Sequence, residues 1–264
     1  MMLMLLAVAA TSGMFLASNR QMKMQAREVE TTQVARAAAD MIVRDLRLGG
    51  ACLPVTGDFI SLDGVNSGNL DEITTRTGLT RPDLSCIRSA VPTGKQVTKA
   101  GTAVPVASSA GFVAGMRAYI RAPNGTGEFF VINTVASATQ LTKSTTLSQV
   151  YPESSGVYGI DERRFYLATR STPQGPLPEL MLQIGSQTPQ SFAVGIENLA
   201  IQYQLRRNCP PCDTTNLPVD DTEWSIVERV LLSVTARSDL PDTAGNYYRR
   251  TVTVGVKPRN LLPP

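Results

Sequence analysis

The first nineteen residues of this chain, Met1 to Asn19, carry no charged side chain. Thr11, Ser12 and Gly13 are the polar or small residues that interrupt the apolar run before Ser18. As an α-helix rising about 1.5 Å per residue, this run comes close to the thickness of a membrane's hydrocarbon core. A charge-free helix of this kind is stable in lipid or among other apolar helices, because both environments leave its backbone hydrogen bonds internal.

The helix is predicted to continue well beyond the apolar run. Residues 20–48 contain neither Pro nor Gly, so no residue there breaks a helix. Charged residues recur at 20, 23, 27 and 30 and again at 36, 40, 44 and 47, and these steps of three and four form stripes on a helix surface. Gly49 and Gly50 then supply a stop. The sequence therefore predicts one helix over residues 1–50, apolar first and amphipathic afterwards.

Composition narrows the classes of function. The 264 residues carry a formal net charge of only +3, without the concentrated basic stripe of a nucleic-acid-binding protein. The chain has no histidine, the commonest general base and metal ligand, which lowers the expectation of hydrolytic or zinc chemistry. We expect no enzymatic activity and no cofactor.

The four cysteines, Cys52, Cys86, Cys209 and Cys212, indicate an oxidising compartment, because an even number beside a membrane-directing segment favours disulfides. The charges around the apolar run point to a different compartment than the cysteines do. Arg20, Lys23 and Arg27 follow the run, and no basic residue precedes it. The positive-inside rule would then keep the following chain in the cytoplasm. A basic leader missing ahead of Met1 would reconcile the two. An in-frame stop codon directly upstream would contradict that expectation.

The rest of the chain divides by composition into three parts. Residues 51–90 read as connecting loops with a first strand, residues 91–158 as a β-rich insertion, and residues 159–264 as an antiparallel sheet. Two long runs, Ser225–Arg237 and Tyr247–Val256, predict a hairpin at the centre of that sheet. The fold class expected is α+β: a long N-terminal helix, then an antiparallel β head with a small all-β insertion.

Several stretches resemble a known family. They are SNRQ (Ser18–Gln21), VRDLRLGGAC (Val43–Cys52), GIENLAIQYQL (Gly195–Leu205), VERVLLSVTARS (Val227–Ser238) and YYRRTVTVGVKPRN (Tyr247–Asn260). Together with the charge-free helix, and in this order, they resemble the minor pilins of type IV pili, specifically the PilW-like group. The resemblance covers the helix and the C-terminal third, and residues 91–158 match less specifically. The family's basic leader, the Gly before its cleavage point and the Glu at its fifth position are absent from this sequence.

The resemblance implies a prepilin-type subunit that helps initiate or cap a pilus-like filament serving motility, adhesion or DNA uptake. It implies an inner-membrane single-pass protein with an extracytoplasmic head that later joins the pilus at the cell surface. The implied partners are other minor pilins, the major pilin, the prepilin peptidase and the inner-membrane assembly platform. The membrane or filament helix would use its first apolar residues: Met1, Leu3, Leu5, Leu6, Val8, Gly13, Phe15 and Leu16.

Two other classes of function stay open. One is a minor pseudopilin of type II secretion, which shares the architecture. The other is a membrane-anchored binding module or adhesin that uses the β-rich part at 91–158. The basic pairs Arg206-Arg207 and Arg249-Arg250 make no DNA-binding patch by themselves, because adjacent strand residues face opposite sides.

The remaining candidate sites have structural interpretations. The stretch Asp63–Glu72 has oxygen ligands at short spacing but lacks the EF-hand pattern, so we interpret it as a solvated turn rather than a calcium site. Cys209-Pro-Pro-Cys212 has the spacing of a redox motif, but it follows a predicted strand, and a single CxxC is half a zinc signature. Four cysteines allow three pairings, of which we favour Cys52–Cys86 and Cys209–Cys212.

Overall fold

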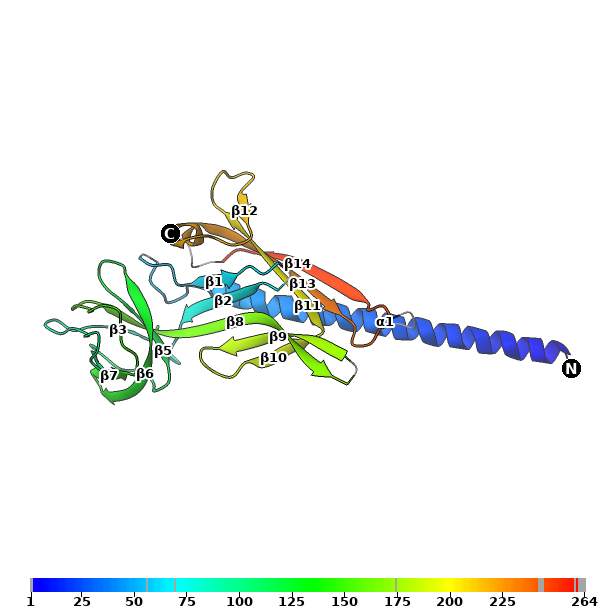
Figure 1. The fold of residues 1–264 in the computed structure, drawn as a ribbon, viewed down its shortest axis with the longest axis horizontal. Coiled ribbons are helices and arrows are strands. Elements are labelled where there is room, and N and C mark those ends of the chain that lie inside the picture. The colour runs from blue at the N-terminus through cyan, green and yellow to red at the C-terminus, as the bar shows by residue number, and fades with distance from the viewer. Residues whose placement is uncertain are drawn as a thin grey trace.

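A computed structural model describes residues 2–55, 57–68, 70–173, 175–241, 245–258 and 260. Its first element is the helix α1 (Met2–Leu48), which projects far beyond the sheets at its N-terminal end (Figure 1). The helix ends where Gly49 donates its N–H to the Asp45 carbonyl and Gly50 adopts a φ of +81°. A Cβ at Gly50 would lie 2.7 Å from the Asn260 carbonyl oxygen, so the turn that brings the C-terminal segment against the helix end requires glycine there.

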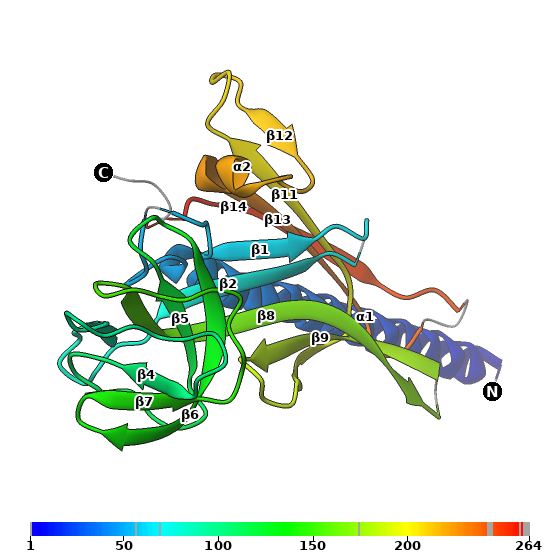
Figure 2. The ribbon, with the colours of Figure 1, turned by 60° about the vertical axis from the view of Figure 1, so that its left-hand side comes forward.

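In the described residues fourteen strands follow, and ten of them form one curled antiparallel sheet (Figure 2). Its centre is β8, whose 17 residues pair with β2, β3, β5 and β9. The strand order is β1-β2-β8-β5-β6-β7-β4, with β3 and β9 also on β8 and β10 on β9. The bounds are β1 Leu62–Val65, β2 Glu72–Gly78, β3 Arg88–Ala90, β4 Ala103–Pro105, β5 Arg117–Arg121, β6 Gly127–Ser137, β7 Gln140–Lys143, β8 Gly156–Thr172, β9 Gly175–Ile184 and β10 Gln190–Val194.

The second sheet has four antiparallel strands in the order β12-β11-β13-β14. They are β11 (Ile196–Leu205), β12 (Asp213–Thr215), β13 (Val227–Arg237) and β14 (Arg249–Val256), and the short helix α2 (Asp221–Ser225) precedes β13. Residues of β13 alternate strictly between buried and partly exposed from Val230 onward, as expected when one face covers a core. β14 is the outer strand of this sheet, so the predicted hairpin is not its centre.

The main core lies between the C-terminal half of α1 and both sheets. From the helix, small and branched residues at helical spacing are fully or nearly fully buried: Ala35, Ala38, Ala39, Ile42, Val43 and Leu46. The alanines allow the sheet to approach the helix closely, and Ile42 and Leu46 fill the space between β-sheet side chains. A second core, with Phe130, Ile132 and Tyr151 fully or almost fully buried, lies among β3 to β7.

The expected α+β class is wrong. The described chain is mainly antiparallel β, with fourteen strands, α1 and one five-residue helix. The strands make two sheets rather than one head sheet, and the β-rich segment is no separate insertion. Residues 117–121 pair with residues 156–160 of β8, so its strands continue the ten-stranded sheet. The composition of a segment indicates strands, but not which other strands will pair with it.

Candidate assembly surface

In the N-terminal half of α1, the side chains that the structure describes lie outside both cores. From Met14 to Glu30, the described side chains are exposed or partly exposed, and Thr31 is the first buried one. Within this part Phe15, Met22 and Val29 expose 68%, 60% and 55% of their surface. They lie seven residues apart, close to two helical turns, so they share one side of the helix. The projecting helix therefore presents an apolar stripe, defined here as Phe15, Met22 and Val29, with no described partner in the chain.

The helix enters the main core where the stripe ends. Thr31 donates its hydroxyl to the Arg27 carbonyl at 2.7 Å, and the next turns enter the main core. A cavity of about 450 Å³ lies beside the exposed part of the helix. It is lined by Met24, Arg27 and Glu28 of α1 and by Ser238, Tyr247 and Tyr248 of the β13–β14 connection. Burial is the first cause that raises the pKa of Tyr248, and a hydrogen bond with Glu28 adds to it.

A buried carboxylate fixes the other end of the helix. Asp45 is buried and receives the Arg163 guanidinium of β8 at 3.2 Å, and Arg163 also pairs with Asp161 at 3.1 Å. Burial raises the pKa of Asp45 and outweighs the opposing attraction of Arg163. The pair therefore positions α1 on the larger sheet more than it stabilises the fold, because the desolvation of a buried ion pair offsets its attraction.

Asp71 joins the two sheets. Its carboxylate accepts the backbone N–H of Ile201 in β11 and of Ser67, each at 2.8 Å, and its own N–H bonds to the Leu199 carbonyl at 3.0 Å. The neighbouring carboxylates of the candidate calcium stretch are also engaged with protein groups: Asp63 pairs with Arg76, and Glu72 pairs with Arg164. In the described residues, no group of three potential metal ligands converges.

Glu162 links strands β2, β5 and β8 of the larger sheet. One of its oxygens binds the Nε of Arg76 at 2.5 Å and the other binds Arg117 at 2.7 Å. Both guanidinium groups lie about 5 Å from the centre of the Phe129 ring, at 5.0 and 4.8 Å. A carboxylate between two arginines stacked on one ring holds β2, β5 and β8 in register where the larger sheet curls.

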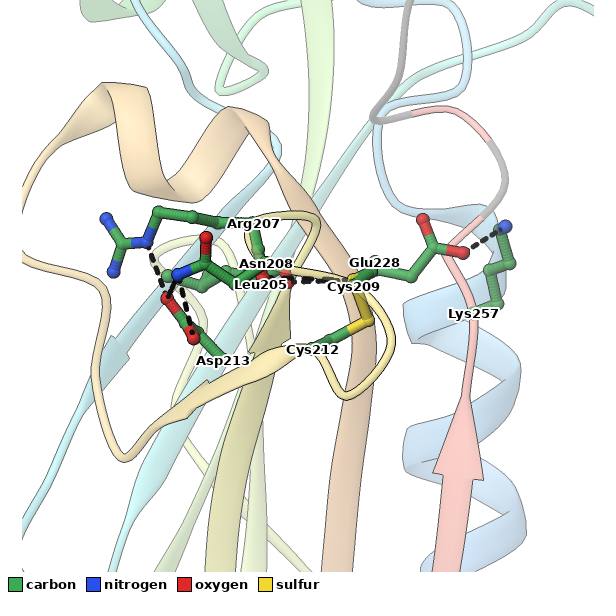
Figure 3. The surroundings of a disulfide bond; sticks show 8 residues. All are labelled: Leu205, Arg207, Asn208, Cys209, Cys212, Asp213, Glu228 and Lys257. Carbon is green, nitrogen blue, oxygen red and sulfur yellow. Dashed lines mark hydrogen bonds and ion pairs between the residues drawn. A yellow bond between two sulfur atoms is a disulfide. The ribbon is translucent and has the colours of Figure 1, made fainter.

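The cysteines form the disulfides Cys52–Cys86 and Cys209–Cys212, the two pairings that the sequence analysis favours. The second closes the loop between β11 and β12, beside the ion pair of Arg207 with Asp213 at 2.8 Å (Figure 3). Strands lie on both sides of this loop, so it lacks the helix N-terminus that lowers a thiol pKa in redox-active CxxC sites. The first disulfide ties the segment after α1 to the segment before β3.

Of the residues predicted for the membrane or filament helix, the structure describes the side chain of Phe15 alone. Phe15 is exposed on the stripe, whereas Met1 lies outside the described residues. The backbone of the others is helical and their side chains are outside the description: Leu3, Leu5, Leu6, Val8, Gly13 and Leu16. Met22 and Val29 are not among the predicted site residues, although their spacing of seven from Phe15 is visible in the sequence.

The expected inner-membrane single-pass localisation is corrected. Across the part of the chain that the structure describes, no helix combines the length and the apolar character that crossing a bilayer requires. Comparisons with protein-family models and with curated proteins found no match to this chain.

Proposed function

We propose that this protein is a non-enzymatic structural subunit, a minor pilin that helps initiate or cap a type IV pilus-like filament. The observation that carries the proposal is the apolar stripe on the projecting half of α1, at residues 15, 22 and 29. The resemblance of five sequence stretches to PilW-like minor pilins supports the same role.

The stripe gives the assembly a driving force. Fully burying a side chain such as Phe, Met or Val contributes about 1.5–3 kcal/mol, so three of them against a neighbouring helix supply a substantial part of a specific contact. Spacing of seven residues suits side-by-side packing of long helices, in which each apolar side chain inserts between those of the partner. The partners proposed are the corresponding helices of other minor pilins and of the major pilin.

The anchoring of α1 supports a structural role. The helix is held by the main core and by the Asp45–Arg163 pair. A force on the projecting half is therefore transmitted to both sheets, as a subunit in a filament requires. The sheets then lie outside the helix bundle, where they can contact neighbouring subunits.

The experiment is to shear filaments from the producing cells and to detect this chain in them by immunogold labelling and mass spectrometry. A strain with the gene deleted and a complemented strain are compared in parallel. We expect sparse labelling of filaments and a large loss of filament number on deletion, restored by complementation. Filaments of unchanged number and composition in the deleted strain would contradict the proposal.

A further inference from the structure

The edge of the smaller sheet at β14 is open. Among the described residues, β14 pairs with β13 and with no other strand, and no other backbone hydrogen bond reaches it. Ser238 donates its N–H to the Tyr248 carbonyl at 2.8 Å, and this pair continues the register of the two strands. Bonded pairs alternate along an antiparallel ladder. The N–H and C=O groups of Arg249, Thr251, Thr253 and Gly255 therefore point away from β13, and within the described residues no backbone group bonds to them.

A groove runs between this edge and α1. Its volume is about 830 Å³, and Val43 of the helix and Val254 of the strand lie at its apolar part. Asp40, Arg44, Arg47 and Leu48 also line it. The groove thus places helix side chains next to unpaired backbone groups of a strand. An added β-strand could occupy such a groove and bond to those backbone groups.

The groove is lined by two cationic side chains, Arg44 and Arg47, and by one anionic side chain, Asp40. Arg36, Arg44 and Arg47 lie on one exposed stripe of α1, and Arg250 lies on the same face of β14 as Val254. Within the described residues none of these four arginines forms an ion pair, and Asp40 is the carboxylate among them. On the other face of the hairpin, Arg249 pairs with Glu197 and Lys257 pairs with Glu228.

We propose that this groove binds an extended acidic segment of a partner polypeptide, which adds to β14 as a fifth strand of the smaller sheet. The open N–H and C=O groups would bond the backbone of the segment. Side chains alternate across a strand, so every second residue of the segment would face the α1 stripe, and carboxylates at those positions would meet Arg36, Arg44 and Arg47. β14 has eight residues, so a segment of about that length fits.

A nucleic acid would match the arginines but not the strand edge. Its phosphates accept hydrogen bonds, whereas an open strand offers alternating donors and acceptors. The peptide is therefore the occupant that uses both features of the groove.

The probe is an eight-residue peptide of alternating Thr and Glu, labelled with a fluorophore, and its binding to the full-length protein is measured by fluorescence anisotropy. One matched probe is the same peptide with Lys in place of Glu, and another is a single-stranded 20-mer DNA. Two further probes are Glu peptides with every second backbone nitrogen methylated, one at the odd positions and one at the even positions. We expect the Glu peptide to bind at least tenfold more tightly than the Lys peptide and than one of the methylated peptides.

The protein variants separate charge from strand addition. The double variant Arg44→Glu with Arg47→Glu should bind the Glu peptide at least tenfold more weakly than the unmodified protein does. The same variant should bind the Lys peptide more tightly than the unmodified protein does. Arg88→Glu with Arg170→Glu is the matched control, because both arginines are exposed and carry no ion pair in the described part of the chain. Thr253→Pro removes an outward N–H, and Thr253→Ala, which loses the same hydroxyl, is its control.

Four results would overturn the proposal. The first two are that the Glu peptide does not bind, or that both methylated peptides bind equally well. The third is that the Arg88 and Arg170 control loses as much affinity for the Glu peptide as the Arg44 and Arg47 variant does. The fourth is that DNA binds in a way that depends on Arg44 and Arg47 while the peptide does not bind. If Thr253→Pro fails to fold, the methylated peptides alone decide whether the backbone is recognised. The measurement uses single subunits, so its failure would leave the filament role untouched.

Discussion

Tyr203 is one of the few polar groups inside the main core. Its ring lies edge-on to Trp224 with the ring centres 5.0 Å apart, and its hydroxyl lies close to the backbone of Gly64 in β1. Burial, together with the negative charges of Asp71 and Asp63, raises the pKa of this hydroxyl above its ordinary value. The folded protein therefore holds the Tyr203 proton more tightly than the unfolded chain does.

The first prediction follows from this difference. The stability associated with the protonated hydroxyl is complete below pH 10, the pKa of an ordinary tyrosine, and is lost as the pH rises above it. Tyr203→Phe should reduce the loss of unfolding free energy between pH 8 and pH 11 by about 1 kcal/mol. Urea unfolding at both pH values measures it. A loss as steep in Tyr203→Phe as in the unmodified protein would contradict the assignment.

The second prediction concerns Asp71, which accepts two backbone N–H groups and links the sheets. In Asp71→Asn the amide must turn an N–H toward one of these donors, leaving a buried group without an acceptor. We expect a loss of about 1–3 kcal/mol in unfolding free energy by urea titration. Asp239→Asn, on an exposed residue, is the control and should change stability by less than about 0.5 kcal/mol. Equal losses in the two variants would contradict the role of Asp71.

The sequence predicts the positions of some side chains but not their ion-pair partners. The stripe of charges at 36, 40, 44 and 47 was visible as a pattern, and Arg36, Arg44 and Arg47 are exposed in the structure. The pairing of Asp63 with Arg76 and of Glu72 with Arg164 was not visible, because these partners come from other strands. The oxygen-rich stretch from Asp63 to Glu72 lacks the EF-hand pattern and predicts a solvated turn, but in the structure its carboxylates bind protein groups.

At the scale of elements, α1 contributes packing in its second half and an uncovered surface in its first. The third prediction contrasts the halves. Ile42→Ala removes a fully buried side chain between the helix and the sheets and should cost about 2–5 kcal/mol of unfolding free energy. Met22→Ala, on the exposed stripe, should change the stability of the isolated subunit by less than about 0.5 kcal/mol.

Chemical unfolding of the subunit at low concentration, where helices do not associate, checks this contrast. If Met22→Ala destabilised the subunit as much as Ile42→Ala, the N-terminal half of α1 would have a partner within the chain. That result would remove the reason for treating the stripe as an assembly surface.

Strands were easier to locate in the sequence than to pair. The runs expected at Ser225–Arg237 and Tyr247–Val256 lie at β13 and β14. Their position in the sheet was wrong, since β14 is an edge. The composition change near residue 158 lies within β8, whose first residues pair with β5 and whose later residues pair with β2 and β9. Alternation defines a strand, but long-range packing chooses its neighbours.

This pairing also changes how the middle of the chain can be tested. A deletion of residues 91–158 would remove β5 and the start of β8 from the larger sheet. It would also remove Arg117 from the Glu162 cluster. Substitutions of single exposed residues are therefore the appropriate test of a binding role for this region, because a deletion would unfold its neighbours.

Considered as a whole, the molecule is a long helix with two curved sheets gathered around its C-terminal half (Figures 1 and 2). The Glu162 cluster links β2, β5 and β8 within the larger sheet, and Asp71 joins the two sheets. The apolar stripe and the open edge of β14 lie on different parts of this body. One surface would therefore join helices, and the other would bind a strand of a partner.

The central claim is that the apolar stripe of α1 assembles subunits, and the fourth prediction tests it by placing charges on the stripe. Phe15→Asp with Met22→Asp should abolish filament incorporation, scored as immunogold particles per length of sheared filament, while the circular dichroism spectrum of the subunit stays unchanged. Leu84→Asp is the matched control, because Leu84 exposes 82% of its surface at a site far from the helix stripe in sequence. We predict normal incorporation for Leu84→Asp and none for the double variant. Normal incorporation of the double variant would contradict the account.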